Sequence, residues 1–229
     1  MDAPDVDPRE LERSLSDLQH VNRWLGGRRT ALQPLAAMLR RLPRGRPYRV
    51  LDVASGAADI PRDVVRWGRR HGYALHVVAA DLHAGTLAVA RRQTADEPAI
   101  SVLAADARAL PLPDGAVDFA LCSTALHHFD EPDAVRVLRE LGRVARRGVV
   151  VNDLLRSWLG VVGVHLLAAT LWRGHPVTRH DGPLSLRRSY TAPELRALAR
   201  RAGLCEARVR RHALWSRLSL VVDRTAAAP

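Results

Sequence analysis

The sequence predicts a single α/β domain organised around a mostly parallel sheet of about seven strands. The first observation is an alternation along the chain, in which short apolar runs are separated by segments whose apolar residues recur at helical spacing. The second is the stretch Arg49–Pro61, where an apolar strand leads through a turn of small residues into a helix. The third is length, because 229 residues suffice for one domain with a substantial core.

Two helices are expected before the first strand. Residues 1–8 hold two prolines and three aspartates and are predicted to be a loose arm. Apolar side chains then recur at helical spacing from Leu11 until the glycine pair at 26–27, which ends the helix. A second helix carries leucines from Leu32 onward and is broken at Pro43.

The strand–turn–helix stretch has the features of a nucleotide cradle. Its small turn residues let a backbone approach a ligand closely, and a helix that begins at Asp59 points free N–H groups at that ligand. A dinucleotide is disfavoured, because Asp59 stands where the pattern G-x-G-x-x-G needs its third glycine. A Walker loop is excluded, since the chain contains no lysine. A cationic ligand without phosphate fits this acidic rim better.

The remaining segments alternate as a parallel α/β sheet requires. Asp81 and Asp106 directly follow their predicted strands, and Asp153 follows the strand over 148–151 after Asn152. The expected elements are a helix over 59–70, strands over 76–80 and 101–105 with a helix over 85–92 between them, strands over 117–122 and 148–151, a helix over 191–203, and two strands around 206–210 and 214–222.

Two motifs carry a resemblance to a known family. The segment Asp52–Asp59, which reads D-V-A-S-G-A-A-D, resembles motif I of the class I S-adenosylmethionine-dependent methyltransferases, usually D-x-G-x-G-x-G; it departs at Ala54 and Ala58. The segment Leu110–Asp118 resembles the family's LPxPDxxxD signature. The resemblance implies a Rossmann-like, doubly wound, seven-stranded sheet that ends in an antiparallel hairpin. It also implies S-adenosyl-L-methionine as the cofactor.

The resemblance further implies the cofactor-binding residues. Asp81 would accept hydrogen bonds from the ribose hydroxyls, although it could instead cap the next helix. Asp106 would bond the adenine amino group, with the backbone of Ala107 against the ring. The two leading helices would cover the cofactor, or they could simply pad the sheet. The full set of expected cofactor residues is Asp52, Ala54, Ser55, Gly56, Asp81, Leu82, Asp106, Ala107 and Ser123.

His127 and Asp153 are the candidate catalytic residues. They follow the fourth and fifth predicted strands, whose carboxyl ends should share one edge of the sheet. They resemble the His and Asp that work together in small-molecule O-methyltransferases. A histidine oriented by a carboxylate can take the proton of an alcohol or phenol near neutral pH. His127 could instead only pack or cap, and a metal held by His127, His128 and Asp130 is a further alternative, although methyl transfer needs no metal and none is expected.

The acceptor side is expected in the segments after the fifth strand. Residues 154–172 are apolar nearly all round and either belong to the core or line an apolar pocket. Residues 173–190 are polar and are predicted to form a long lid loop. The candidate substrate-contacting residues are His128, Trp158, His180, Arg187 and Tyr190.

The charge and the cysteine content of the chain limit which partners and which cellular location can be predicted. The net charge is +11, so nucleic acid or an anionic membrane surface must be considered, but the arginine pairs are scattered and GC-rich coding explains them as well. Cys122 and Cys205 are expected to be reduced core thiols. The acidic beginning of the chain lacks a signal region and no apolar run reaches membrane-spanning length, so a cytoplasmic location is predicted.

The predicted function is O-methylation of a small, apolar, hydroxylated metabolite of the phenolic, enolic or polyketide-like kind, in secondary metabolism. The partner is the small-molecule acceptor, nucleic acid is not expected, and the chain is a monomer or homodimer. The alternatives are an RNA methyltransferase, a C- or N-methyltransferase of a small molecule, and a non-catalytic binding protein. The one methyltransferase domain is divided into a helical cap (1–47), a cofactor-binding core (48–155), an apolar helix with the lid (156–190), and a final helix with the hairpin (191–229).

Overall fold

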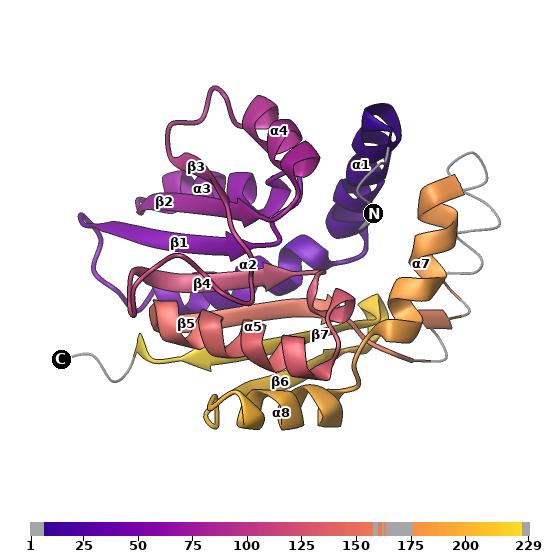
Figure 1. The fold of residues 1–229 in the computed structure, drawn as a ribbon. Coiled ribbons are helices and arrows are strands. Elements are labelled where there is room, and N and C mark those ends of the chain that lie inside the picture. The colour runs from indigo at the N-terminus through magenta and orange to yellow at the C-terminus, as the bar shows by residue number, and fades with distance from the viewer. Residues whose placement is uncertain (1–6, 158–159, 162, 164–175, 226–229) are drawn as a thin grey trace.

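The protein is built on one seven-stranded sheet with strand order β3-β2-β1-β4-β5-β7-β6 (Figure 1). The computed structural model describes residues 7–157, 160–161, 163 and 176–225. Strands β1 to β5 are parallel, whereas β7 runs antiparallel to β5 and β6 antiparallel to β7, which confirms the predicted fold class and the closing hairpin. The strands are β1 (Pro47–Val53), β2 (Ala74–Asp81), β3 (Ile100–Ala104), β4 (Val117–Ser123), β5 (Ala145–Leu154), β6 (Arg208–His212) and β7 (Arg217–Asp223).

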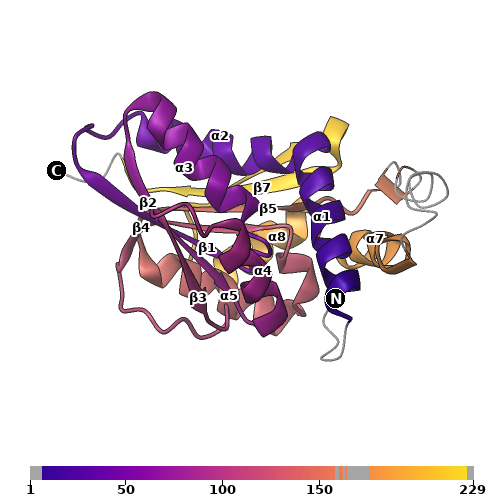
Figure 2. The ribbon, with the colours of Figure 1, turned by 90° about the horizontal axis from the view of Figure 1, so that it is seen from above.

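Helices cover both faces of the sheet. Helices α2 and α3 lie on one face, and α5 and α8 lie on the other, so the buried apolar side chains form two principal clusters (Figure 2). The helices are α1 (Pro8–Trp24), α2 (Gly27–Leu39), α3 (Asp59–His71), α4 (Ala84–Gln93), α5 (Glu131–Val144), α7 (Pro176–Arg188) and α8 (Ala192–Arg201), with 3-10 turns η1 (Leu126–His128) and η2 (Ala213–Trp215). None of the described helices combines the length and hydropathy that a bilayer span requires.

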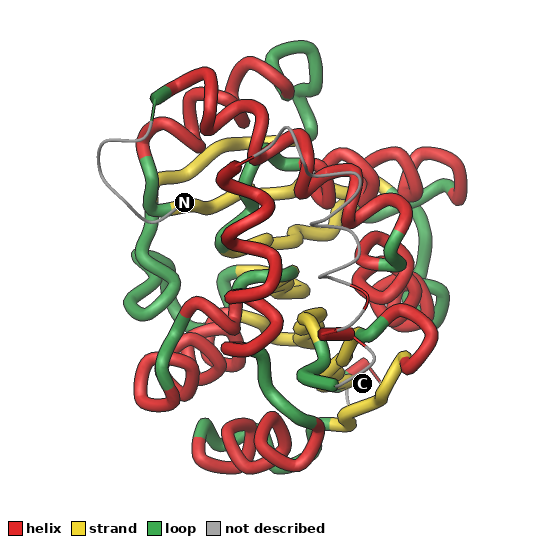
Figure 3. The backbone as a smooth tube through the Cα atoms, turned by 90° about the vertical axis from the view of Figure 1, so that its right-hand side faces the viewer, coloured by secondary structure: helices red, strands yellow, loops and turns green. Residues whose placement is uncertain are grey.

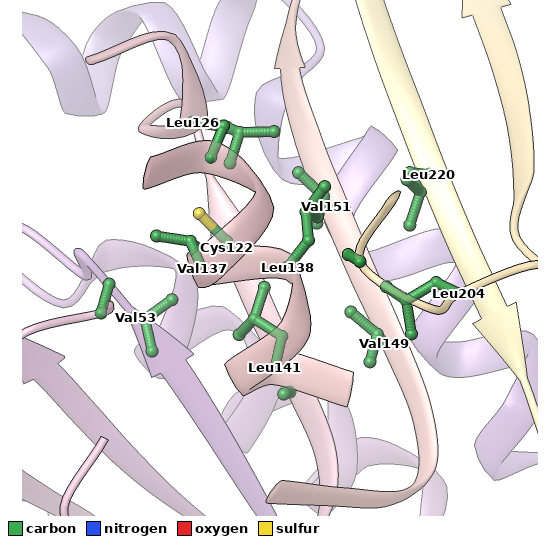
Figure 4. Packing of buried hydrophobic residues seen from close by; sticks show 14 of the residues in the cluster. Val53, Cys122, Leu126, Val137, Leu138, Leu141, Val149, Val151, Leu204 and Leu220 are labelled. Atoms are coloured by element: carbon green, nitrogen blue, oxygen red, sulfur yellow. The ribbon is translucent and has the colours of Figure 1, made fainter. Parts of the chain in front are cut away.

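Helix α5 was not among the expected elements, although it connects β4 to β5. Its start is marked by Asp130, whose side chain accepts a hydrogen bond from the Asp133 N–H at 2.9 Å. Its buried face, including Leu138 and Leu141, packs against Val149 of β5 (Figure 4). The cap and the apolar spacing are both legible in the sequence, so this helix could have been predicted.

The prediction of a lid loop over residues 173–190 is wrong for the part that the structure describes, because residues 176–188 form α7. Gly182 and Pro183 are typical of a loop, but tertiary packing outweighs them: Leu186 is buried, and α7 lies against η1 and α1. Most of the apolar segment 154–172 lies outside the described residues.

The two cysteines differ in their surroundings. Cys122 lies in the core on β4, as expected, and burial raises the pKa of its thiol, with Asp153 and Asp52 adding to the effect. Cys205 is exposed in the turn after α8, so the expectation of a core thiol is wrong there. The turn places Leu204 inside and its neighbour outside.

The carboxyl ends of the parallel strands meet at one edge of the sheet, on the right in Figure 1, where α1 and α7 also lie. Figure 3 looks onto this edge and shows helices standing in front of the strand ends. Contacts between α1 and α7 close this end of the molecule. The fold therefore places both the cradle after β1 and the turn after β4 beneath these helices.

Candidate active site

A cavity of about 1000 Å³ lies at this edge and joins most of the expected site residues. Of the expected cofactor set, Ala54, Gly56, Asp81, Leu82, Asp106 and Ala107 line it, and so do His127 and His128. A small adjoining hollow of about 30 Å³ is lined by Asp52, Ser55, Ser123 and Asp59. The cradle and the candidate catalytic histidine thus line the same cavity.

The cradle keeps a glycine-like backbone even though two of its positions are alanine. Ala54 and Ala58 have φ values of 51° and 59°, in the left-handed region that favours glycine, and Gly56 between them has φ 57°. A hydrogen bond from the Ser55 N–H to the Ala80 carbonyl, 3.0 Å long, ties the turn to β2. The departures from motif I therefore change the side chains and leave the shape of the turn intact.

The strain at Ala54 leads to a stability prediction. Ala54→Gly should raise the free energy of unfolding by about 0.5–1 kcal/mol, because relief of the left-handed strain exceeds the added chain entropy. Ala57→Gly is the matched control: Ala57 has no positive φ, and its replacement should lower stability by about 1 kcal/mol. Urea unfolding of both variants measures the difference, and equal destabilisation by the two changes would contradict the interpretation.

Asp52 is a buried carboxyl group whose two oxygens have no hydrogen-bond partner among the described residues. Burial raises its pKa well above the usual value, and the nearby carboxylates of Asp59 and Asp81 raise it further. The hydroxyls of Ser55 and Ser123 beside it also lack partners within the described structure. Unsatisfied acceptors around a small acidic hollow fit a positively charged, hydrogen-bond-donating ligand, and S-adenosylmethionine carries a sulfonium and an ammonium group.

Asp52→Asn should stabilise the cofactor-free protein and weaken its binding of cofactor. Because the folded-state pKa of Asp52 is raised, the stability of the wild-type protein falls as the pH rises above 3.8, the ordinary pKa of an aspartate, and through the folded-state pKa. The amide does not ionise, so the variant should be more stable by about 1–3 kcal/mol at neutral pH. Urea unfolding between about pH 5 and pH 8 tests this prediction. If the free energies of unfolding of the two proteins vary with pH in parallel, the prediction is refuted.

Asp81 holds the cradle and the end of β2 together. Its carboxylate accepts hydrogen bonds from the Gly56 N–H and the His83 N–H, both at 3.1 Å. Helix α4 begins after His83 without a side-chain cap, so Asp81 is not its N-cap. Asp81 lines the cavity from this position, and its binding of the ribose hydroxyls stays a prediction.

Asp106 lies at the cavity wall with its carboxylate bound by Arg108. Three Asp106–Arg108 side-chain hydrogen bonds of 2.7 to 3.1 Å lower the pKa of Asp106. Arg108 also donates to Asp133 at 2.9 Å, which anchors the pair to α5. A contact between Asp106 and adenine, which stays a prediction, would have to coexist with this arginine.

His127 and Asp153 form a buried pair, as expected from their places at the carboxyl ends of β4 and β5. The Nδ1 atom of His127 lies 2.7 Å from Oδ1 of Asp153, and the His127 backbone N–H donates to Oδ2 at 2.9 Å. Burial alone would raise the pKa of Asp153, but its charge interaction and hydrogen bonds with His127 hold it below the usual value. Asp153 thus fixes both the backbone and the ring of His127 at the cavity wall.

The expected substrate residues are only partly brought together. His128 is exposed and lines the cavity, with its ring centre 4.2 Å from that of His127. Tyr190 instead donates from its hydroxyl to the Phe129 carbonyl at 2.8 Å, and burial raises the pKa of Tyr190 to about 12, with nearby carboxylates adding to the effect. Arg187 is exposed and does not line the cavity. Trp158 and the side chain of His180 lie outside the described residues.

Arg217 of β7 is a cavity-wall residue that sequence reasoning missed. It is the largest fully buried side chain among the described residues, with 0% of its surface exposed. Its Nε donates to the Leu25 carbonyl at 2.8 Å, Nη1 to Thr124 Oγ1 at 3.0 Å, and Nη2 to Asn22 Oδ1 at 3.4 Å. The guanidinium therefore ties the end of α1 to the ends of β4 and β7. Nothing in the local sequence marks this arginine among the other arginines of the hairpin.

The same network reaches the cradle. Asn22 donates to Asp59 Oδ2 at 3.3 Å, so α1 is bonded to the first residue of α3. Burial lowers the pKa of Arg217 to about 10, and the carboxylates of Asp153 and Asp59 oppose that effect. The charge of this one buried cation thus acts both on Asp59 of the cradle and on Asp153 of the His127–Asp153 pair.

Comparisons with known proteins agree with this geometry. A family model described as a methyltransferase domain matches residues 50–148. A ubiquinone/menaquinone biosynthesis C-methyltransferase, UbiE, of Methylobacterium nodulans is 35% identical over 125 residues, which are 54% of this chain and 48% of that protein. A demethylmenaquinone methyltransferase of Thermus thermophilus is 36% identical over 103 residues, 44% of each chain. The match thus spans less than half the length of these relatives.

Solved structures share the whole fold. A SAM-dependent methyltransferase from Aquifex aeolicus aligns over 95% of this chain and 98% of its own, with a TM-score of 0.62 and 21% identity. The CMeT domain of the citrinin polyketide synthase aligns over 83% of this chain and 50% of that chain, with a TM-score of 0.63 and 15% identity. At these identities the likeness concerns the fold, and the family rests on the matched domain together with the motifs it contains. Residues 50–148 thus form a methyltransferase domain of the class I S-adenosylmethionine-dependent kind, whose cofactor is S-adenosyl-L-methionine.

Proposed function

We propose that this protein is a cytoplasmic enzyme that methylates a small, apolar, hydroxylated acceptor, with His127 as the base and Asp153 as its orienting partner. The observation that carries the proposal is the continuity of the cavity between the cradle and the buried His127–Asp153 pair. Apolar side chains from several elements line the acceptor half and favour an apolar ring or chain: Leu18, Leu25, Phe129, Leu186, Leu214 and Trp215.

The cofactor supplies an electrophilic methyl group, and the residues of this chain position and deprotonate the acceptor. Asp153 engages Nδ1 of His127, which leaves Nε2 to accept the proton of an acceptor hydroxyl. Methyl transfer is an in-line displacement, so holding the acceptor oxygen or carbon close to the methyl group supplies much of the acceleration. Helices α1 and α7 limit the access of water to this space.

The acceptor atom can be oxygen or carbon. Loss of a phenolic proton makes both the oxygen and the ortho carbons of the ring nucleophilic, so the same base serves O- and C-methylation. We favour oxygen from the resemblance of the His–Asp pair, and carbon is the second candidate because two relatives are named for C-methylation in ubiquinone and menaquinone biosynthesis. A 125-residue alignment cannot include both α1 and α7, so those names do not extend to the whole acceptor pocket.

The test is a methyl-transfer assay with labelled S-adenosylmethionine and matched phenol, catechol and hydroquinone acceptors. We expect transfer to apolar phenols, and NMR of the product locates the methyl group on oxygen or carbon. Mass spectrometry of small molecules that co-purify with the protein supplies further acceptors. Absence of transfer to every member, with cofactor binding intact by calorimetry, would refute the acceptor class; absence of cofactor binding would favour a non-catalytic protein. Methylation of RNA with salt-sensitive binding would support the RNA alternative.

A further inference from the structure

The described structure exposes three large apolar side chains, two of which line the cavity. They are Trp24, Leu82 and Leu214, with 66%, 57% and 86% of their surface exposed. Leu82 and Leu214 line the cavity itself. Trp24 ends α1, and Gly26 just beyond it approaches Trp215 of η2 so closely that an added Cβ would lie 2.7 Å from the indole. The end of α1 and η2 therefore adjoin, and we call Trp24, Leu82 and Leu214 the apolar rim.

Guanidinium groups accompany the apolar rim. Arg23 lies over the Trp24 ring, 5.4 Å from its centre. Arg210 and Arg211 are exposed near the end of β6, separated from η2 by His212, and Arg188 is exposed in the last turn of α7. Within the described structure, none of these four arginines lies within 4.0 Å of a carboxylate oxygen, although the charge of Arg23 acts on Asp63. These four arginines thus place positive charge on α1, α7 and β6, the elements that carry or adjoin Trp24 and Leu214.

We propose that the apolar rim docks on an anionic lipid bilayer. Leu214 and Trp24 would enter the headgroup–acyl boundary, where a tryptophan beside an arginine is favourable, and the guanidinium groups would meet lipid phosphates. A second copy of this chain is a poorer occupant, because a two-fold interface would set the same unpaired arginines against each other. Docking would let a lipophilic acceptor pass from the bilayer into the cavity, a consequence that rests on the proposed function, whereas docking itself does not.

Flotation of the full chain with vesicles tests the proposal. The protein should float with vesicles of phosphatidylcholine containing about 30% phosphatidylglycerol and remain behind with phosphatidylcholine alone, and added salt should weaken the binding. Trp24→Glu and Leu214→Glu should each lower the bound fraction about tenfold. The matched control is Arg44→Ala at the opposite edge of the sheet, where Arg44 covers Tyr73 and has no carboxylate partner among the described residues. It removes one positive charge and should leave flotation unchanged.

Several outcomes would overturn the proposal. Absence of flotation would do so, as would an equal loss for Arg44→Ala and Trp24→Glu, which would indicate charge alone. A concentration-dependent dimer that Trp24→Glu dissociates would assign the apolar rim to a second copy. Circular dichroism of each variant checks that it is folded. Calorimetry with S-adenosylmethionine and methyl transfer to a water-soluble phenol, both done without vesicles, report on the proposed function separately, so either hypothesis can fail while the other stands.

Discussion

Replacement of His127 by alanine is expected to lower kcat for methyl transfer by about 10²–10⁴. The imidazole is buried at the cavity wall with Nδ1 held by Asp153, so the replacement removes a base whose ring is already oriented. Asp153→Asn should also lower kcat strongly, because an amide neither stabilises the protonated ring nor fixes its tautomer. Initial rates across a range of acceptor concentrations measure both effects.

The adjacent histidine supplies the control. His128 lines the same cavity but is exposed, and its replacement by alanine should affect KM more than kcat. Calorimetry must show unchanged cofactor affinity in the His127→Ala variant. A second variant, His127→Asn, keeps an amide that can donate to Asp153, so it tests the base in a protein whose buried hydrogen bond is retained. Unchanged turnover in both His127 variants would remove this residue from the mechanism and leave positioning as the main source of the rate.

Arg217→Met should lower the free energy of unfolding by about 3–5 kcal/mol, which corresponds to a fall in Tm on the order of 10 °C. The change removes the donor to the Leu25 carbonyl and to Thr124 Oγ1, and it leaves Asn22 Oδ1 with Thr124 as its donor. It also removes a cation whose charge acts on both Asp153 and Asp59. Cofactor affinity should fall as well, because α1 loses its bond to β7. Thermal unfolding and calorimetry give the two values.

Arg224 offers a matched comparison. Like Arg217, it donates to the backbone; its acceptors are the carbonyls of Gly142 and Ala145, each at 3.0 Å. Unlike Arg217, it is partly exposed and does not line the cavity. Arg224→Met should cost about 1–2 kcal/mol and leave cofactor affinity unchanged. If the Arg217 and Arg224 variants lose the same stability and neither loses affinity, Arg217 is an ordinary structural arginine.

Most of the secondary structure follows from local sequence. The strands β1, β2 and β4 were predictable from short apolar runs, and α1, α2 and α8 from apolar spacing that ends at glycine or proline. Helix α7 was not, because Gly182 and Pro183 favour a loop and only the burial of Leu186 against distant elements outweighs them. Helix α5 was not predicted, although the capping residue Asp130 and the helical spacing of the apolar residues after it indicate a helix.

The sequence by itself determined the family and the cradle, since a strand, a turn of small residues and a helix start lie within one short window and their chemistry is local. It also placed His127 and Asp153 at neighbouring strand ends, because the order of parallel strands constrains where their carboxyl ends meet. Only the tertiary structure decided which other residues join them. Arg217 and Leu25 stand 192 positions apart, and their hydrogen bond depends on how β7 and α1 pack, which no periodicity encodes. The same packing exposes Trp24 and Leu214, because burial is a property of the assembled chain and not of a residue type.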